Sequence, residues 1–487
     1  MVNTSIMLLI LLGVPLVCAA ALAFTGDRKF APEINILSSA ATFAAGLGLA
    51  VEVYMQGPML AGGKFFFVDA FNVYLAVLTS FVSMTTAIFS RRYMRKEREH
   101  GRIGHRHMRF YHAMFQLFIF AMLLCLLTNN VGVLWIAMEL ATLSTVLLVS
   151  LYRTPTAIEA AWKYFILCGV GIAQALFGTV LLYFAAEKVL GEGGEALLWT
   201  NLSRVSGQLE PTVLSLAFVF LMVGYGTKVG LVPLHNWLPD AHSEGPTPIS
   251  AVLSGLLLNI ALYALVRCKV LVDGSTQSHH AGDIMMGFGI LSILVAAFSL
   301  LRQKDIKRMF SYSSIEHMGI ATFAFGLGGQ LATFGALLHM LVHSLAKSAI
   351  FFTVGHASQM HNTQQMDRIR GLFRGNPLVG WGLMFGVLAI VGMPPFGIFT
   401  SEFLILTATI KDAPLWTPLL LLGLGVAFAA LLRKVQPMVS GEIPPNQKSM
   451  RAAHLPVMLH MALVLIIGLY IPDFLNQWFH TAVGLLK

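Results

Sequence analysis

Five ionisable residues stand inside long runs of apolar residues. Glu139 lies in WIAMELATL, Lys163 in AAWKYFIL, Lys228 after VFLMVGYGT, Lys347 at the end of HMLVHSLAK, and Glu402 in FGIFTSEFL. Placing a charge in hydrocarbon costs about 2.5 to 3.5 kcal/mol on insertion scales, so such residues face protein or water and commonly serve function. The alternative is a structural ion pair or, for a residue near a helix end, a side chain that reaches the membrane surface.

A stripe of titratable groups follows from the spacing of His339, His343 and Lys347. Residues four apart share one face of an α-helix, about 6 Å apart along its axis. One or two waters can bridge that distance, so the stripe is suited to passing protons. The first alternative is a set of hydrogen-bonded core histidines. The second is haem ligation, but axial ligands normally approach one haem from opposite sides, which residues on one helix face cannot do.

Prolines interrupt the apolar run that carries Lys228. In KVGLVPLHNWLPDAHSEGP, Pro233 and Pro239 follow that lysine closely. Proline removes a backbone donor and breaks a helix, and freed backbone at membrane depth must line a cavity or be buried in protein. We therefore expect His235, Asp240 and His242 to lie where water enters, at the mouth of a half-channel.

A second interruption precedes Glu402. The stretch AIVGMPPFGIFTSEF contains Pro394, Pro395 and Gly397. Paired interrupted segments are typical of inverted repeats in transporters, with the functional site at the repeat interface. The alternative is that these prolines only kink packed helices.

The elements that position these residues are membrane spans. Of the 487 residues 56% are hydrophobic and 11% charged, and the mean hydropathy is +0.74. We predict an all-α integral membrane protein with about fourteen transmembrane helices in two inverted five-helix repeats, each with a broken helix. The expected spans are 5–24, 34–55, 66–89, 111–128, 130–151, 158–186, 213–237, 246–272, 282–301, 309–327, 330–358, 377–410, 414–435 and 453–478.

Four units follow from these spans. Residues 1–110 form a three-helix segment with a basic cytoplasmic loop, 111–272 the first five-helix repeat, 273–435 the second, and 436–487 the C-terminal helix.

The positive charge of the chain is a matter of topology. The formal net charge is +9, and most of the 32 lysines and arginines fall in alternate loops, eight of them between Arg91 and Arg109. The same side receives Lys304, Lys307, Lys448 and Arg451, whereas Arg267, Lys269 and Lys487 are assigned to the other. Cytoplasmic loops carry such an excess, so we expect both termini outside the cytoplasm of a bacterial or archaeal inner membrane. Nucleic acid is not an expected partner.

The four cysteines, Cys18, Cys125, Cys168 and Cys268, each stand alone in an apolar run. None has the spacing of a metal site, so we expect no metal and no cofactor in this chain.

Three stretches carry a family resemblance. KVGLVPLHNWLPDAHSEGPTPISAVLSG, DIKRMFSYSSIEHMGI and MPPFGIFTSEF resemble segments of the antiporter-like proton-translocating subunits of respiratory complex I, of multisubunit cation/proton antiporters and of membrane-bound group 4 hydrogenases. The resemblance covers roughly residues 65 to 435.

The resemblance implies a path for protons. Glu139 pairs with Lys228, and the proton passes along a central hydrophilic axis to a terminal residue, here Glu402. The stripe of His339, His343 and Lys347 matches the family's relay on its eleventh helix, and Lys163 matches the lysine of the sixth. The glutamate at 402 resembles that of the middle antiporter-like subunit of complex I.

One departure concerns the eighth helix, where the family often has a central lysine and this chain aligns Asn259. An asparagine cannot hold the extra proton, so a relay there needs water. This stretch, together with SSIEHMG and its Glu316 and His317, most resembles component F of hydrogenase-4 and formate hydrogenlyase-type complexes. With Asp240 and His242, these three residues form the expected secondary set of the half-channels.

The expected function is proton translocation by a membrane subunit of a redox-driven complex of the group 4 [NiFe]-hydrogenase type. The subunit is not catalytic alone. Its partners would be other membrane subunits, the lipid bilayer and a peripheral cytoplasmic redox arm that carries the NiFe and iron–sulfur centres. The alternatives are a subunit of a multisubunit Na⁺/H⁺ antiporter or of complex I, a quinone- or haem-binding redox enzyme, and a scaffold that no longer conducts.

Overall fold

A computed structural model describes residues 2–276, 279–442 and 453–486. Three of the loop charges, Lys448, Arg451 and Lys487, lie outside these residues. The α-helices are α1 (Val2–Thr25), α2 (Ala31–Gln56), α3 (Ala70–Glu99), α4 (His105–Leu127), α5 (Val131–Val149), α6 (Pro155–Leu190), α7 (Trp199–Val205), α8 (Pro211–Val229), α9 (Trp237–Glu244), α10 (Thr247–Val252), α11 (Leu258–Thr276), α12 (His280–Leu300), α13 (Ile306–Leu327), α14 (Gly329–His361), α15 (Leu372–Gly375), α16 (Pro377–Ile390), α17 (Gly397–Asp412), α18 (Thr417–Ser440), α19 (His454–Leu469) and α20 (Asp473–Leu485). One hairpin pairs β1 (Met59–Ala61) with β2 (Phe66–Val68), Leu60 opposite Phe67.

Eleven helices in the described ranges are long and apolar enough to cross a membrane, or twelve if α19 and α20, bent by 79°, count as one span. Every expected span contains at least one helix, but the predicted number of about fourteen is not confirmed. One difference is α13, whose start and middle carry Lys307, Arg308 and Glu316. The other is the expected span 377–410, which is divided into α16 and α17 of 14 and 16 residues.

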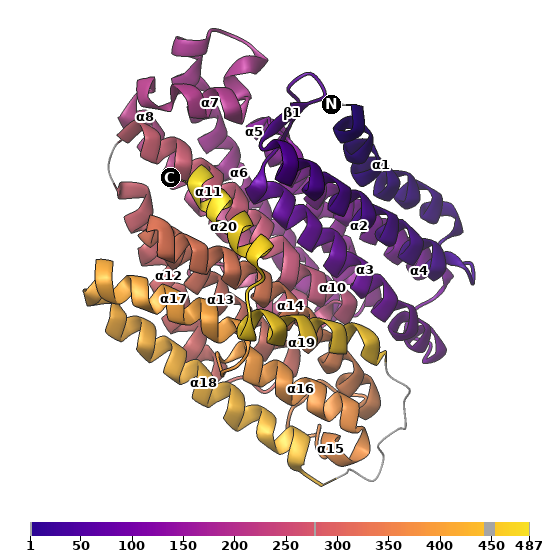
Figure 1. Ribbon diagram of the computed structural model, residues 1–487. Coiled ribbons are helices and arrows are strands. Elements are labelled where there is room, and N and C mark those ends of the chain that lie inside the picture. The colour runs from indigo at the N-terminus through magenta and orange to yellow at the C-terminus, as the bar shows by residue number, and fades with distance from the viewer. Residues whose placement is uncertain (1, 277–278, 443–452, 487) are drawn as a thin grey trace.

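The centre of the bundle is a continuous helical segment, α10 to α11, joined by a π-helical turn at Leu253–Leu257. Its most apolar stretch is entirely buried, and that of α14, which packs against α10 and the π turn, is 94% buried. Figure 1 shows α1 to α4 side by side at one end of the bundle and α16 to α18 at the other. The helix that carries His339, His343 and Lys347 therefore lies in the interior.

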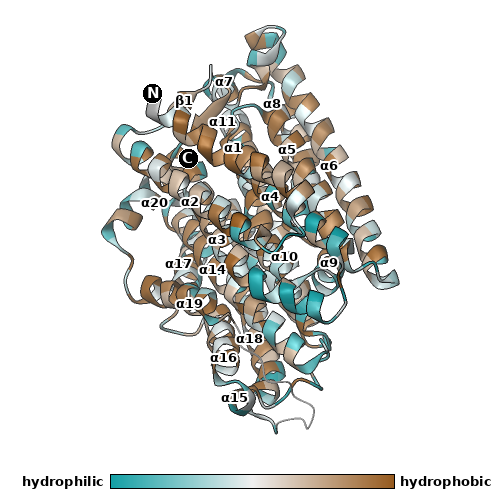
Figure 2. Ribbon diagram, turned by 90° about the vertical axis from the view of Figure 1, so that its right-hand side faces the viewer, coloured by the Kyte–Doolittle hydropathy of each residue, from teal (hydrophilic) through white to brown (hydrophobic). Residues whose placement is uncertain are grey.

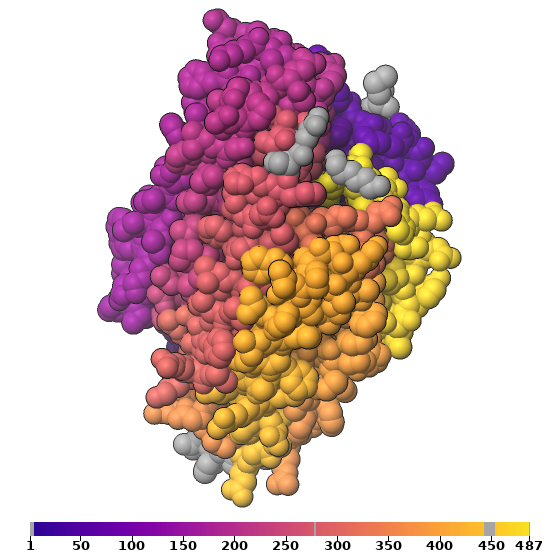
Figure 3. Space-filling model, turned by 90° about the vertical axis from the view of Figure 1, so that its left-hand side faces the viewer, coloured from indigo at the N-terminus to yellow at the C-terminus, as the bar shows by residue number. Residues whose placement is uncertain are grey.

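The outer helices present apolar side chains. Figure 2 shows mostly hydrophobic helices, with hydrophilic residues gathered around α9 and the helix ends beside it. On the face shown in Figure 3, the purple of α5–α6 and the orange of α16–α18 flank a pink band from the middle of the chain. Only 28% of the apolar stretch of α18 and 39% of that of α6 are buried. These helices are available to lipid or to other membrane subunits.

Both predicted helix breaks are present. Helix α8 ends at Gly230, whose φ of +82° is a left-handed conformation that glycine adopts without steric cost, and α9 begins only at Trp237. Helix α16 ends at Ile390, Gly392 has a φ of +69°, and α17 begins at Gly397. The freed backbone is partly satisfied locally: the Trp237 indole donates to the carbonyl of Thr227 at 2.8 Å.

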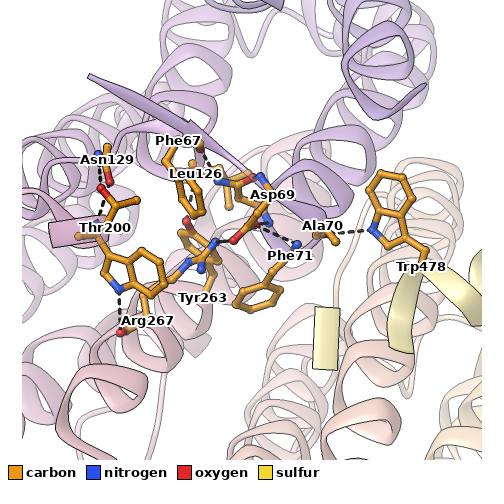
Figure 4. Close-up of polar contacts among 12 residues, drawn as sticks. Phe67, Asp69, Ala70, Phe71, Leu126, Asn129, Thr200, Tyr263, Arg267 and Trp478 are labelled. Carbon is orange, nitrogen blue, oxygen red and sulfur yellow. Dashed lines mark hydrogen bonds and ion pairs between the residues drawn. The ribbon is translucent and has the colours of Figure 1, made fainter. Parts of the chain in front are cut away.

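A polar clamp, consisting of Asp69 and Arg267 with the aromatic rings around them, holds β2, α3, α7 and α11 together (Figure 4). Asp69 caps α3 by accepting hydrogen bonds from the backbone amides of Phe71 and Asn72. Its other carboxylate oxygen accepts a hydrogen bond from Arg267 Nη2 at 2.6 Å. The guanidinium lies 4.4 Å from the ring centroid of Trp199. The assignment of Arg267 to a loop was wrong, because this carboxylate and these rings replace water around a charge that is only 2% exposed.

Candidate functional site

The first half of the site is the pair formed by Lys228 and Glu139. Lys228 is on the last turn of α8 and is fully buried, and Glu139 is in the middle of α5 with a side chain 21% exposed. The lysine Nζ lies 3.8 Å from Oε2 of the glutamate, so the structure brings together the two residues that the resemblance pairs. This separation exceeds that of a direct hydrogen bond.

The hydrogen bond of Lys228 goes instead to Thr142, one turn after Glu139 on α5. The ammonium also lies 5.9 Å from the ring centroid of Tyr164, which itself stacks on Trp237 at 4.5 Å. Because an ammonium has three donors, two remain for other partners. Oε2 of Glu139 has no hydrogen bond among the described residues. A proton can therefore move between these groups after a small shift or through one water.

The break after α8 carries the expected mouth of the half-channel. The Asp240 carboxylate, on α9, lies 3.3 Å from Lys163 Nζ and also forms an ion pair with Arg308 of α13. Lys163 is 49% exposed and pairs with Glu159 at 2.7 Å on its own helix. The structure therefore places Lys163 at the rim of the mouth, not in the interior with Lys228.

The two histidines of the break have different surroundings. The His235 ring lies at the edge of Tyr312, with 6.2 Å between the ring centroids. His242 is fully buried and stacks on Phe351 of α14 at 5.0 Å. Neither nitrogen of His242 has a partner among the described residues, and a buried polar atom without a protein partner usually binds water.

The second half of the site is a histidine cluster built from three helices. Nδ1 of His317, on α13, lies 3.1 Å from Nε2 of His339, on α14. Nδ1 of His339 lies 2.9 Å from the Ser401 hydroxyl on α17. All three side chains are buried, so an unbroken run of polar atoms crosses from α13 to α17.

His343 and Lys347 continue this cluster along α14. The ring of His343 lies 5.5 Å from that of His317 and 6.3 Å from that of His339. Its two nitrogens are buried and without partners among the described residues. Lys347 donates to the carbonyl of Phe310 at 3.0 Å, and Glu316 is buried on the same stretch of α13. The predicted stripe on α14 therefore faces two further titratable groups on α13.

Glu402 sits beside the second break. A Cβ placed on Gly392 would lie 2.2 Å from Oε2 of Glu402, so the carboxylate occupies the space that this glycine leaves open. Donor atoms of Glu402, His317 and His339 all lie within 4.8 Å of one another. Both nitrogens of His339 are already engaged, which favours proton exchange over metal ligation at this cluster.

Asn259 lies in the middle of the bundle on α11. Its amide donates to Ser344 Oγ at 2.7 Å and to the carbonyl of Met340 at 3.1 Å, both on α14. Five residues before Asn259, the hydroxyl of Ser254 forms a hydrogen bond with that of Ser314 on α13, at 2.6 Å. Neutral polar groups therefore occupy the place where the resemblance leads one to expect a lysine.

Several residues of the site were not singled out from the sequence. Thr142 and Ser401 lie on the same helices as Glu139 and Glu402, one turn or one residue away, which is the signal that could have identified them. Lys307 was assigned to a loop, but it is buried on the first turn of α13, where its ammonium donates to the carbonyls of Ser243 and Gly245 at 3.0 and 2.7 Å.

Comparison with known proteins identifies the family to which this chain belongs. Residues 128–428 match the family model described as "NADH:quinone oxidoreductase/Mrp antiporter, TM". The chain belongs to this family. The matched residues of this antiporter-like family member include both helix breaks and every residue of the expected relay.

Relatives of this family member include a hydrogenase-4 component F homolog from Methylacidiphilum infernorum (isolate V4), which is 47% identical over 97% of this chain and 98% of that protein. In the structure of the membrane-bound sulfane sulfur reductase, an archaeal respiratory membrane complex, a chain 25% identical aligns with a TM-score of 0.89 over 99% of this chain and 97% of that one. The Mrp complex from Dietzia sp. DQ12-45-1b contains a chain of the same fold, with 18% identity and a TM-score of 0.88 over 100% and 98% of the two chains. The protein is thus a multi-pass membrane subunit of the antiporter-like type.

Proposed function

We propose that this chain conducts protons across the membrane for a redox-driven complex of the group 4 [NiFe]-hydrogenase type. The observation that carries the proposal is the fully buried Lys228, held 3.8 Å from Glu139 at a broken helix. A buried ammonium beside a carboxylate can change its protonation when the distance between the two changes, because each charge stabilises the other. A conformational signal from a partner can therefore move a proton here.

The histidine cluster provides the onward path. His317, His339 and Ser401 form a continuous polar contact from α13 to α17, and Glu402 lies beside it at the second break. We infer that Glu402 is the terminal residue and that Asn259 and the neighbouring serines connect the two halves through water. Lys163 and Asp240 would act at the mouth, by setting the field near Lys228.

The choice of complex is supported by similarity along nearly the whole chain to a hydrogenase-4 component F homolog. Electron transfer, NiFe and iron–sulfur centres would then reside in partner subunits, in a peripheral arm on the cytoplasmic side where the basic loops lie. Both termini would face the opposite side. The same relay would serve a multisubunit Na⁺/H⁺ antiporter or complex I, to whose subunits the family model also applies.

Copurification in mild detergent through a tag on this chain tests the choice of complex. The expected result is nickel and iron, with a large metal-binding subunit and iron–sulfur subunits identified by mass spectrometry. Recovery of hydrophobic subunits alone, without metal, would instead favour the antiporter, and proton uptake driven by a sodium gradient would then be the measurement that decides.

A further inference from the structure

Basic side chains from three segments of the chain meet around a cavity of about 290 Å³, which we call the basic pocket. The segments are the link between α12 and α13, the link between α14 and α15, and the end of α18. The volume is near the lower limit for small-molecule sites, which is about 300 Å³. The polar residues that line the pocket are Gln303, Lys304, Asp367, Arg370, Arg433 and Lys434.

Hydrogen bonds hold the three segments around the basic pocket. Lys434 Nζ, on α18, donates to the carbonyl of Gln303 at 3.0 Å. The two links lie side by side, because the amide of Met366 donates to the carbonyl of Lys304 at 2.9 Å. The backbone therefore keeps several like charges close together, although these charges repel one another.

The cations of the pocket keep free donors. Among the described residues, neither Lys304, Arg370, Arg433 nor Lys434 forms an ion pair with a carboxylate. Arg370 uses only its Nε, which donates to the carbonyl of Asp367 at 2.9 Å. Four cations thus face the single carboxylate of Asp367, and such an excess of one sign attracts an oppositely charged ligand.

The basic pocket lies where apolar, outward-facing helix surface ends. Helices α12 and α18 pack against each other, and both reach the pocket at their C-terminal ends. Shortly before those ends, Phe298 and Leu301 of α12 and Phe428 of α18 are exposed. A ligand held here therefore meets cations at one end and apolar side chains at the other. Basic pockets between transmembrane helices on the cytoplasmic side are typical sites for the headgroups of anionic lipids.

We propose that the basic pocket binds the phosphate of an anionic phospholipid from the leaflet on the side of the basic loops, and that its acyl chains lie along α12 and α18. Lys304 and Arg433 supply the free charges, and a guanidinium can donate two parallel hydrogen bonds to one phosphate. The lipid would join the start of α13 to the end of α14, the two helices that bring His317 and His339 together. The site itself does not depend on the proton path or on the choice of complex.

Photocrosslinking in proteoliposomes that contain the intact complex tests this site. The probe is phosphatidylglycerol with a diazirine in its acyl chain, and crosslinked peptides are identified by mass spectrometry. We expect crosslinks on the peptides that contain Phe298 or Phe428. Unlabelled phosphatidylglycerol should compete several-fold better than phosphatidylcholine with the same chains. An inorganic anion or an acidic protein segment in the pocket would leave both peptides without this preference, and that result would overturn the proposal.

Two double variants of equal charge change localise the effect. Lys304→Gln with Arg433→Gln removes the two free cations of the pocket. Arg106→Gln with Arg374→Gln, both exposed on the same side and outside the pocket, is the matched control.

We expect the pocket variant to lower the crosslinking yield about tenfold or more, at the strength typical of basic residues beside anionic lipid, and the control to leave it unchanged. Equal yields in the two variants would overturn the site, because net charge alone would then recruit the lipid. The competition on the native complex decides even where a variant fails to assemble.

Discussion

Nδ1 of His317 and Nε2 of His339 lie 3.1 Å apart although they belong to different helices, α13 and α14. At this distance the two rings share one hydrogen, so a proton arriving at either ring can leave from the other. The contact extends the polar stripe of α14 to a second helix, and it connects through Ser401 to the helix that carries Glu402.

Replacing Lys228 with methionine keeps the volume of the side chain and removes its charge. We expect Lys228→Met to abolish coupled proton movement while the complex still assembles, since no other cation lies within ion-pair distance of Glu139 among the described residues. Proton uptake by proteoliposomes containing the intact complex measures the effect. Lys411→Met, an exposed lysine at the end of α17, is the control. Normal pumping by Lys228→Met would refute the relay.

His339 can be compared with a second buried histidine of the same helix. His356, further along α14, accepts the amide of Ala453 at 2.9 Å and stands outside the cluster. We expect His339→Gln to lower proton flux strongly, because an amide does not titrate, and His356→Gln to preserve it, because the amide oxygen can still accept. Equal losses in the two variants, at equal assembly, would show that His339 is only structural.

Gly392 leaves space for the Glu402 carboxylate. A Cβ at this position would meet Oε2 at 2.2 Å, and a φ of +69° is unfavourable for alanine. Gly392→Ala should therefore displace Glu402 and reduce proton flux. Gly425→Ala, on α18 with no atom near the new methyl group, should have no effect. Flux is measured per assembled complex, and unchanged flux in Gly392→Ala would argue against Glu402 as the terminal residue.

The clamp of Asp69 and Arg267 should determine stability. Removing one member of a buried ion pair leaves an uncompensated charge, which costs about 3–5 kcal/mol. We expect Arg267→Leu to lower the thermal stability of the purified complex markedly. Adding Asp69→Asn, which removes the stranded charge and retains a helix cap, should recover part of the loss. The flux per assembled complex should stay the same, and a double variant no more stable than Arg267→Leu would contradict this account.

The sequence predicted the two breaks, because prolines in apolar runs are strong local signals, and the family resemblance implied that Lys228 pairs with Glu139. It did not predict the contact between His317 and His339, which depends on the rotation of α13 against α14. Lys163 shows the opposite difficulty. Its apolar neighbours Trp162 and Ile166 are 58% and 54% exposed, so an apolar run on α6 did not imply burial. Lys307 was assigned to a loop because the span was predicted to begin at residue 309. In the structure Asp305 caps α13, and the helix begins at Ile306.

The π-helical turn at Leu253–Leu257 determines which way the side chains of α11 point. An α-helix advances about 100° per residue, so one additional residue in a turn rotates everything after it by about that angle. Both Asn259, which faces α14, and Arg267, which faces Asp69, follow this turn on α11. One additional residue in the middle of the bundle thus orients the Asn259 amide toward α14 and, two turns later, the Arg267 guanidinium toward Asp69. Losing that residue would turn both side chains away from their partners together.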